Sequence, residues 1–377
     1  MLDPTPYRPL FPITEQYAYF NHAGVSPVNT RSVEAMRRFD ESTARLPFSE
    51  IYEEYGKTLL NLRERIATLI NARSVDEIVL MPNTGTGINT AALSLPLRAG
   101  ENVLVLDGDF PANIYPWMNL AHRGVLTKFV PQHNGGLDLD LLQSRIDSHT
   151  RAIALSTVMF ATGFRNDLIA VGQLCRERGL FFVVDGIQSL GTLPFDVQAA
   201  NVDFLACGSL KWLLGPIGSG FLYVRDDLIE DLVPGAYVGA GSVVDAEDFL
   251  DYNFTPLPTA ARFALGAPNV AGAIGLHASL SLIQEVGVDN IAERVLALVG
   301  LAIDDLQARG YRFSASTAIE HRSGILIVEV DDPPAVSARL KAAGIIAIPR
   351  GKGIRIAPHF YNTEEEILRI GPTLDRR

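Results

Sequence analysis

The sequence predicts an α/β protein, with a large domain built on a mostly parallel central sheet and a small C-terminal α+β domain. Short runs rich in Val, Ile, Leu and Phe alternate with amphipathic stretches between residues 77 and 224, as parallel strands covered by helices on both faces do. After residue 271 the pattern changes to long helices and short strands. A chain of 377 residues is also long enough for two domains.

The first part of the chain, residues 1–30, is predicted to be an extended arm. Its opening stretch is rich in proline, with Pro4, Pro6, Pro9 and Pro12. From Arg31 to about Asn71 apolar residues recur at helical spacing, namely Leu59, Leu62, Ile66 and Leu69. We expect these helices to open the large domain, residues 31–258.

The large domain is expected to hold the sheet. Its predicted strands are Glu77–Leu80, Asn102–Leu106, Leu126–Val130, Ala152–Ser156, Leu180–Val184, Phe204–Cys207 and Gly220–Val224. The helical pattern at Leu168–Arg178 is typical of the connections between parallel strands.

The small domain, residues 259–377, is predicted to begin with the helices Ala271–Glu285 and Ile291–Arg309. Its remaining elements are the strands Gly324–Val330, Ile345–Ile348 and Ile354–Ala357 and the helix Ser337–Ala343. Gly and Pro near both ends make Gly235–Pro258 either the link between the domains or an active-site loop.

The composition excludes several classes of function. A net charge of −11 gives no electrostatic reason to bind nucleic acid or an anionic membrane. Two cysteines, Cys175 and Cys207, exclude a disulfide framework and a zinc cluster, and the histidines show no metal-ligand spacing. Because the N-terminus lacks an apolar signal core, we expect a cytoplasmic protein.

Two polar residues follow predicted strands. Asp185 ends the run LFFVVD, at the edge where open α/β sheets bind ligands. Lys211 lies among apolar neighbours, and desolvation lowers a lysine's pKa and makes the amine a nucleophile for carbonyls. Asp185 could instead cap a helix or form a salt bridge, and Lys211 could extend its amine to solvent. Together, a Schiff-base lysine and an acid for a pyridinium nitrogen predict pyridoxal 5′-phosphate (PLP).

A phosphate cradle is predicted at Pro82–Asn89, PNTGTGIN. Small residues between a strand and a helix let backbone N–H groups approach an anion. Taken alone the segment could be an ordinary turn, since it is neither a Walker A loop nor GxGxxG. The sequence also lacks a GxSxG elbow and an HExxH zinc motif.

With these motifs the chain resembles the class V aminotransferase family of fold-type I PLP enzymes, which includes cysteine desulfurases, kynureninases and isopenicillin N epimerase-like proteins. The resemblance runs from YFNHAGVSP (Tyr19–Pro27) to RIAPHFYNTEEEI (Arg355–Ile367). It rests on the order of NTGTGIN, DFPANIYPW, VDGIQSLG, GSLKWLLGP and RFALGAPN. It implies a fold-type I architecture and a homodimer with active sites at the interface.

The resemblance also implies how the cofactor is held. Lys211 would form the Schiff base, Asp185 would bind the pyridine nitrogen and Gln188 the phenolic oxygen. Phe110 would stack on the ring, unless it is a core aromatic. The expected phosphate contacts are Thr84, Gly85, Gly208, Ser209 and, across the dimer interface, Gly266 and Ala267.

For the substrate, the resemblance implies that Arg355 binds the α-carboxylate, a fork suited to bidentate pairing. Arg355 could instead form an ion pair with Glu364–Glu366, which lie nearby in sequence. Asn21 and His22 would line the substrate pocket, although a polar turn after the arm is the alternative.

The sequence departs from the family pattern at several positions. Leu210 replaces the usual His or Tyr, Ala267 replaces a common Thr, and Phe160 falls where desulfurases carry Asn. From the first two departures we expect weaker binding of the cofactor. No cysteine occurs in Ala335–Arg355, where desulfurases carry their nucleophile, so a persulfide relay is disfavoured.

We therefore expect a PLP enzyme that acts on an amino acid, with Lys211 taking the α-proton as general base. Transamination is expected first, and loss of a β-substituent second, as in a cysteine or cystine C–S lyase or a kynureninase. Epimerisation is a further alternative. A relative that binds PLP or a nucleotide-sugar without catalysis also stays open, whereas an NAD enzyme would need the missing glycine fingerprint.

Overall fold

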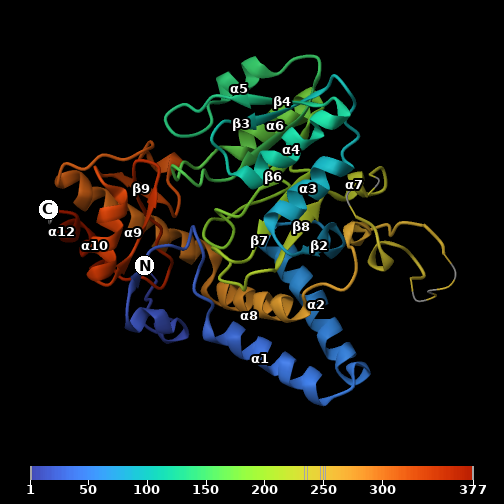
Figure 1. Cartoon of the computed structure of the whole chain (residues 1–377), viewed down its shortest axis with the longest axis horizontal. Coiled ribbons are helices and arrows are strands. Elements are labelled where there is room, and N and C mark those ends of the chain that lie inside the picture. Colours follow the sequence, from blue (N-terminus) through green and yellow to red (C-terminus); the bar gives the residue numbers. More distant parts are fainter. Residues whose placement is uncertain are drawn as a thin grey trace.

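The computed structural model describes residues 2–232, 234–235, 237–246, 248, 250 and 252–375. Its centre is a seven-stranded sheet with the strand order β2-β8-β7-β6-β5-β3-β4 (Figure 1). These strands are β2 (Ile78–Met81), β3 (Asn102–Leu106), β4 (Leu126–Val130), β5 (Thr150–Ser156), β6 (Phe181–Asp185), β7 (Phe204–Gly208) and β8 (Gly220–Val224). The predicted strands of the large domain are confirmed, with small shifts at their ends.

The sheet is mostly parallel, as predicted, but one strand is reversed. β3 to β7 pair in parallel, whereas β8 is antiparallel to both β2 and β7. A parallel strand at Gly220–Val224 was therefore a wrong expectation. A parallel return needs a crossover of about a dozen residues or more, usually helical. The segment between Gly208 and Gly220 holds no helix, so the chain turns back directly.

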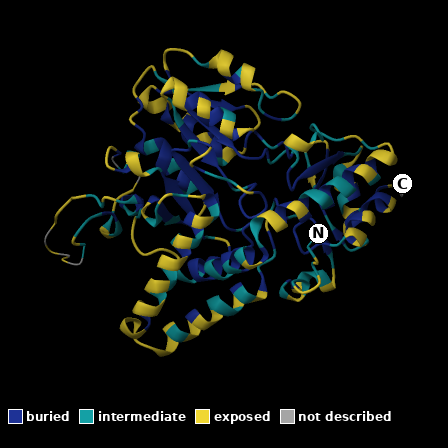
Figure 2. Cartoon of the chain, turned by 180° about the vertical axis from the view of Figure 1, so that it is seen from behind, coloured by how far each residue is buried: buried dark blue, intermediate teal, exposed yellow. Residues whose placement is uncertain are grey.

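Alternate residues of each central strand enter apolar cores on opposite faces of the sheet. On one face Leu155 and Val184 pack with α2 (Phe48–Ile70), α6 (Leu168–Arg178) and α8 (Val270–Val286). On the other, Ala154 and Val183 pack with α3 (Thr84–Ser94) and α4 (Tyr115–Asn119). Figure 2 shows the buried sheet and the exposed outer sides of the helices. Burial on both faces explains the uninterrupted apolar runs of the sequence.

The C-terminal part forms a second core around the three-stranded antiparallel sheet β11-β12-β9. Its elements are β9 (Leu326–Glu329), α10 (Pro333–Ala342), β10 (Ile345–Ile346), β11 (Ile348–Arg350), β12 (Gly353–Ile356), α11 (Glu364–Leu368) and α12 (Ile370–Asp375). Helix α9 (Val288–Ala308) joins the cores, since Val295 packs with the large sheet and Leu306 with the small one. The division at residues 30 and 258 stays a prediction, and the predicted link Gly235–Pro258 lies partly outside the described residues.

The remaining helices are α1 (Thr30–Arg45), α5 (Leu139–Arg145) and α7 (Asp226–Ile229). The helix predicted at Ser337–Ala343 begins earlier, at Pro333, because Asp332 caps it by accepting the N–H of Ala335 and proline is tolerated in a first turn. Within the described ranges, no helix is long and apolar enough to cross a membrane.

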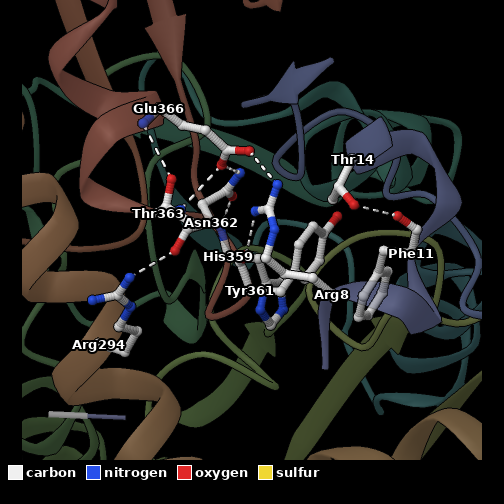
Figure 3. Close-up of polar contacts among 9 residues, drawn as sticks. All are labelled: Arg8, Phe11, Thr14, Arg294, His359, Tyr361, Asn362, Thr363 and Glu366. Atoms are coloured by element: carbon white, nitrogen blue, oxygen red, sulfur yellow. Dashed lines mark hydrogen bonds and ion pairs between the residues drawn. The ribbon is translucent and has the colours of Figure 1, made fainter. Parts of the chain in front are cut away.

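The N-terminal arm is fastened to the C-terminal part. Its strand β1 (Ala18–Tyr19) pairs in parallel with β10. Arg8 donates to Glu366 Oε1 at 2.8 Å and to the carbonyl of Tyr361 at 2.9 Å (Figure 3). Glu366 Oε2 accepts the side-chain amide of Asn362 at 2.9 Å and the N–H of Thr363 at 3.0 Å. We call these five residues the Arg8–Glu366 network, in which both oxygens of the carboxylate have partners.

Candidate active site

Neighbouring strands bring Asp185 and Lys211 to the same edge of the sheet. Asp185 ends β6, and Lys211 follows the end of β7, which pairs with β6. The two side chains are buried, with 1% and 9% of their surface exposed. Burial, aided by the nearby cation of Arg355 and opposed by Asp185, lowers the pKa of Lys211 to about 8. A neutral, nucleophilic amine is thus accessible near physiological pH.

One carboxylate oxygen of Asp185 has no hydrogen-bond donor among the described residues. Its Oδ1 accepts the N–H of Ile187 at 2.9 Å, whereas Oδ2 is buried and has no hydrogen-bond partner among the described residues. Burial, together with the carboxylate of Asp109, raises the pKa of Asp185 in spite of Lys211. A buried oxygen without a donor is costly, so this atom fits a protonated ring nitrogen such as that of PLP.

Phe110 lies beside the lysine with a partly open ring. Lys211 Nζ is 5.3 Å from the Phe110 ring centroid, and Phe110 is 39% exposed. Phe160 packs against it edge-on, with centroids 5.1 Å apart. This arrangement fits stacking on a flat cofactor.

Asp109, which the sequence reasoning missed, fixes the turn that carries Phe110. Its Oδ1 accepts the N–H of Phe110 at 2.7 Å and the hydroxyl of Ser156 at 2.6 Å, and its Oδ2 accepts the Ser156 N–H at 3.0 Å. The available signal was an acid in the short turn after a buried strand, directly before Phe-Pro. Such a residue positions its neighbour rather than the cofactor.

The predicted phosphate cradle is the N-terminus of α3. Asn83 caps the helix by accepting the N–H of Thr86 at 2.9 Å, and the N–H groups of Thr84 and Gly85 in the first turn have no partner within the helix. Thr84 Oγ1 accepts the N–H of Gly208 at 2.9 Å, which ties the cradle to the strand that leads to Lys211. These free amides and the helix dipole fit a phosphate.

Other expected phosphate contacts have protein partners here. Ser209 Oγ donates to the carbonyl of Pro216 at 2.6 Å and lies 2.7 Å from Ser219 Oγ, while the N–H of Ser209 donates to the Ser219 carbonyl. The N–H of Gly208 is engaged by Thr84. In this arrangement neither residue offers a free hydrogen to a phosphate, because the short turn after β7 folds both onto the protein.

Gly266 and Ala267 are exposed. They line an 880 Å³ groove along α2, β2 and the start of α8, whose lining includes neither Lys211 nor Asp185. Pro82 and Thr86 of the predicted cradle also line this groove.

Gln188 is held in one orientation by two partners. Its Oε1 accepts the indole N–H of Trp212 at 3.0 Å, and its Nε2 donates to the carbonyl of Ala23 at 3.2 Å. Because a primary amide carries two hydrogens, Nε2 keeps one further N–H. This donor fits the phenolic oxygen of PLP, and Trp212 is a positioning residue that the sequence reasoning did not identify.

Arg355 is a buried cation without a carboxylate partner among the described residues. It is 1% exposed, donates to Asn21 Oδ1 at 3.1 Å and leaves its Nε unpaired. Burial and the nearby Arg350 lower the pKa of Arg355 to about 10, so it stays charged at neutral pH. The guanidinium is thus available to an incoming carboxylate.

The alternative of an ion pair with the nearby acids finds no support. Glu364 pairs with Arg294, and Glu366 pairs with Arg8. Both carboxylates therefore form ion pairs with cations other than Arg355.

His22 faces the protein interior rather than a ligand. Nδ1 lies 2.7 Å from the carbonyl of Ala357 and Nε2 lies 2.6 Å from the hydroxyl of Tyr361, and the residue is fully buried. Asn21 forms a β-bridge with Ala357, so successive side chains point to opposite sides and only Asn21 reaches Arg355. We therefore assign His22 a supporting role instead of the expected pocket contact.

Neither cysteine is placed as a nucleophile. Cys175 on α6 and Cys207 on β7 are both about 1% exposed, and burial raises the pKa of each thiol. In the part of the chain that the structure describes, no group of His, Cys, Asp and Glu could hold a metal ion. The titratable amine of Lys211 is thus the best-placed reactive group.

Two solved structures resemble the whole chain. One is the cysteine desulfurase CsdA from Escherichia coli, with 26% identity, a TM-score of 0.88, and coverage of 100% of this chain and 98% of that one. The other is the cystine C–S lyase C-DES in complex with cysteine persulfide, with 25% identity, a TM-score of 0.87, and coverage of 97% and 99%. These similarities confirm the predicted fold class.

Sequence comparison gives the same family. A probable cysteine desulfurase of Methanothermobacter thermautotrophicus is 32% identical over 97% of this chain and 95% of its own length. The uncharacterized aminotransferase YcbU of Bacillus subtilis is 29% identical, with the same two coverages of 97% and 95%. The family model described as aminotransferase class-V matches residues 18–370. This chain therefore belongs to the class V aminotransferase family.

Proposed function

We propose that this protein is a PLP-dependent enzyme that acts on an amino acid through a Schiff base at Lys211. The supporting observation is that the buried amine of Lys211 interacts electrostatically with Asp185, whose Oδ2 has no partner among the described residues. When bound, PLP supplies an electrophilic aldehyde and an electron-withdrawing ring. A C-DES variant 25% identical to this chain carries glycine covalently linked to its PLP cofactor.

The residues at the sheet edge hold and orient the cofactor. Asp185 Oδ2 would accept a hydrogen bond from the ring nitrogen and keep a proton on it. The amides of Thr84 and Gly85 hold the phosphate, and Gln188 Nε2 donates to the phenolic oxygen. Phe110 covers one face of the ring and excludes water.

Arg355 and Lys211 act on the substrate. Arg355 binds the α-carboxylate, with Asn21 holding the guanidinium in place. With a substrate bound, Lys211 Nζ would take the proton from the α-carbon. These steps are common to transamination, elimination and epimerisation.

For the reaction that follows, we propose β-elimination from a sulfur amino acid. A relative named as a probable cysteine desulfurase and the structural neighbour C-DES, a cystine C–S lyase, support sulfur chemistry. Both thiols of this chain are buried in the fold, so neither is positioned to accept sulfur. The C–S bond therefore breaks with its electron pair leaving on sulfur, and the three-carbon fragment is hydrolysed to pyruvate and ammonia. Transamination, the first expectation from sequence, is the second candidate, supported by the family description and by YcbU.

Product analysis tests this proposal. The holoenzyme is incubated with L-cystine and with L-cysteine, and pyruvate, ammonia and alanine are quantified. We expect pyruvate and ammonia in equal amounts, and none with Lys211→Met. Alanine without pyruvate would indicate a desulfurase instead, and a keto acid that forms only when a second keto acid is added would indicate a transaminase.

We further propose a homodimer whose partner completes the phosphate site. The exposed Gly266 and Ala267, and the groove beside them with Tyr52 and Leu265 on its lining, support an interface there. Light scattering should give twice the chain mass, and a monomer would contradict the proposal. A weaker cofactor grip and a cytoplasmic location stay predictions, and PLP affinity unchanged by Ala267→Thr would count against the former.

A further inference from the structure

We propose that Arg350 is a second anion-binding residue of the active site, which selects amino acids that carry a second carboxylate on the side chain. The inference rests on the proposed function, because it reserves Arg355 for the α-carboxylate. The distal carboxylate of cystine and the side-chain carboxylates of acidic amino acids share this chemistry.

The register of a short hairpin places both arginines on one face. Arg355 on β12 pairs with Ile348 on β11, and Arg350 lies two residues further along β11. Paired residues share a face, and so do residues two apart in a strand. Gly351, with a φ of 56°, lies in the tight turn between the strands, whose register places the two arginines.

Both guanidinium groups contact Phe160 in different ways. Arg355 Nη1 points toward the carbonyl oxygen of Phe160 at 3.5 Å, a weak contact. Arg350 Cζ lies 5.5 Å from the centroid of the Phe160 ring. Arg350 is therefore held by its stacking contact, with its hydrogen-bonding edge left for another group.

Arg350 has no counter-charge among the described residues. No described carboxylate forms an ion pair with it, and its Nε is a buried donor with no hydrogen-bond partner among the described residues. Two arginines that repel each other without a nearby acid cost free energy unless anions enter. In the proposed function Arg355 binds the α-carboxylate of the substrate, so Arg350 can bind a second anion.

The position of Arg350 indicates which part of a substrate it meets. Phe110 lies beside Lys211 Nζ, Phe160 packs edge-on against Phe110, and Arg350 stacks on Phe160. Two aromatic rings thus separate Arg350 from the reacting amine. A group bound there belongs to the side chain of the substrate rather than to its α-carbon.

Carboxylic acids without an amine test this inference, because they bind without reacting. Glutarate carries two carboxylates, and butyrate is a monocarboxylate of similar length. Their dissociation constants for the holoenzyme are measured by isothermal titration calorimetry. We expect glutarate to bind roughly tenfold or more tightly than butyrate, as one charge-assisted contact allows. Arg350→Met should abolish that preference and leave butyrate binding unchanged, and Arg350→Lys should keep part of it.

Two results with the variants would overturn the inference. A glutarate preference that survives Arg350→Met would show that Arg350 binds no second carboxylate. An equal loss for both acids would show that the two arginines share a single one. Cofactor absorbance and thermal melting verify that each variant is loaded and folded, and Arg350→Gln replaces Arg350→Met if the latter fails to fold.

The assay also separates this inference from the proposed reaction. Binding of acids without an amine needs no turnover. A protein that makes no pyruvate but shows Arg350-dependent glutarate binding would overturn the lyase proposal alone. Pyruvate formation without the glutarate preference would overturn only the role of Arg350.

Discussion

Two of the regions that bury charged side chains, the Arg8–Glu366 network and the candidate active site, satisfy those charges in different ways. In the network, Glu366 receives hydrogen bonds from Arg8, Asn362 and Thr363. In the site, Asp185 Oδ2 and Arg355 Nε have no partners among the described residues. The first region is complete within the chain, whereas the second is complementary to something that binds.

This difference teaches how to distinguish structural from functional buried charges. Removing one member of a satisfied pair leaves an uncompensated charge and destabilises the fold. Removing a charge that has no partner relieves a desolvation cost and destabilises only the bound state. Substitutions in the two regions should therefore change stability and activity in opposite ways.

The largest effect is expected for Lys211→Met, which keeps an apolar stem and removes the amine. Turnover should fall by roughly 10³-fold or more, because the general base is lost. The apoprotein should be as stable as the wild type or more so, since burial disfavours the charged amine. Steady-state rates and urea unfolding of the apoprotein measure the two effects. Residual activity near the wild-type level would break the assignment of the site.

Arg355→Met should lower kcat/KM by about 100-fold, chiefly through KM, because a charge-assisted contact to the α-carboxylate is lost. The unfolding free energy of the apoprotein should not fall, since the guanidinium has no acidic partner among the described residues. Kinetics with the best substrate and urea unfolding provide the measurement. If Arg355→Met markedly lowered the unfolding free energy of the apoprotein, Arg355 would stabilise the fold rather than bind substrate alone.

In the network, Glu366→Gln should destabilise the protein by about 2 kcal/mol, because Arg8 loses its counter-charge while its side chain stays largely shielded from solvent. The activity of the folded fraction should stay near that of the wild type. Glu365→Gln, an exposed neighbour on α11, is the matched control and should change stability little. If Glu366→Gln were as stable as Glu365→Gln, the carboxylate of Glu366 would not stabilise the fold, and the contrast with the active site would be wrong.

A smaller, pH-dependent effect is expected for Asp185→Asn in the apoprotein. Burial raises the pKa of Asp185 above its ordinary value of 3.8 to about 7, so the folded state binds a proton more tightly than the unfolded state does. Ionisation therefore destabilises the wild type progressively as pH rises through that window. The variant escapes this loss, so its stability relative to wild type should increase from pH 5 to pH 8. Urea unfolding at both pH values measures it, and a pH-independent difference would count against an unpartnered Asp185.

Local patterns predicted the elements that depend on local chemistry. The strands followed from apolar runs buried on both faces, and the positions of Asp185 and Lys211 followed from the strand ends before them. The reversed direction of β8 did not follow, because it depends on the absence of a helix in the preceding segment. The start of α10 was missed because Pro333 was not recognised as a first-turn residue.

Hydrogen-bond partners that are distant in sequence were beyond these patterns. Nothing near Ser209 shows that Pro216 will take its hydroxyl, and nothing near His22 shows that Tyr361, 339 residues away, will occupy one of its nitrogens. Arg350 was overlooked because its significance depends on the register with β12 and on the stack with Phe160. Sequence motifs indicate which residue types are present, but the hydrogen-bond partner of each residue follows only from the folded structure.

The pairing of β1 with β10 has a consequence for how the protein is made. Asn21 and its partner Arg355 are 334 residues apart, so a ribosome completes the whole large sheet before the arm can dock. Until then Ala18 and Phe20, both buried in the finished molecule, stay uncovered on the nascent chain. The Asn21–Arg355 contact of the candidate site is therefore among the last to form, and a chain released early would carry Lys211 without the docked arm.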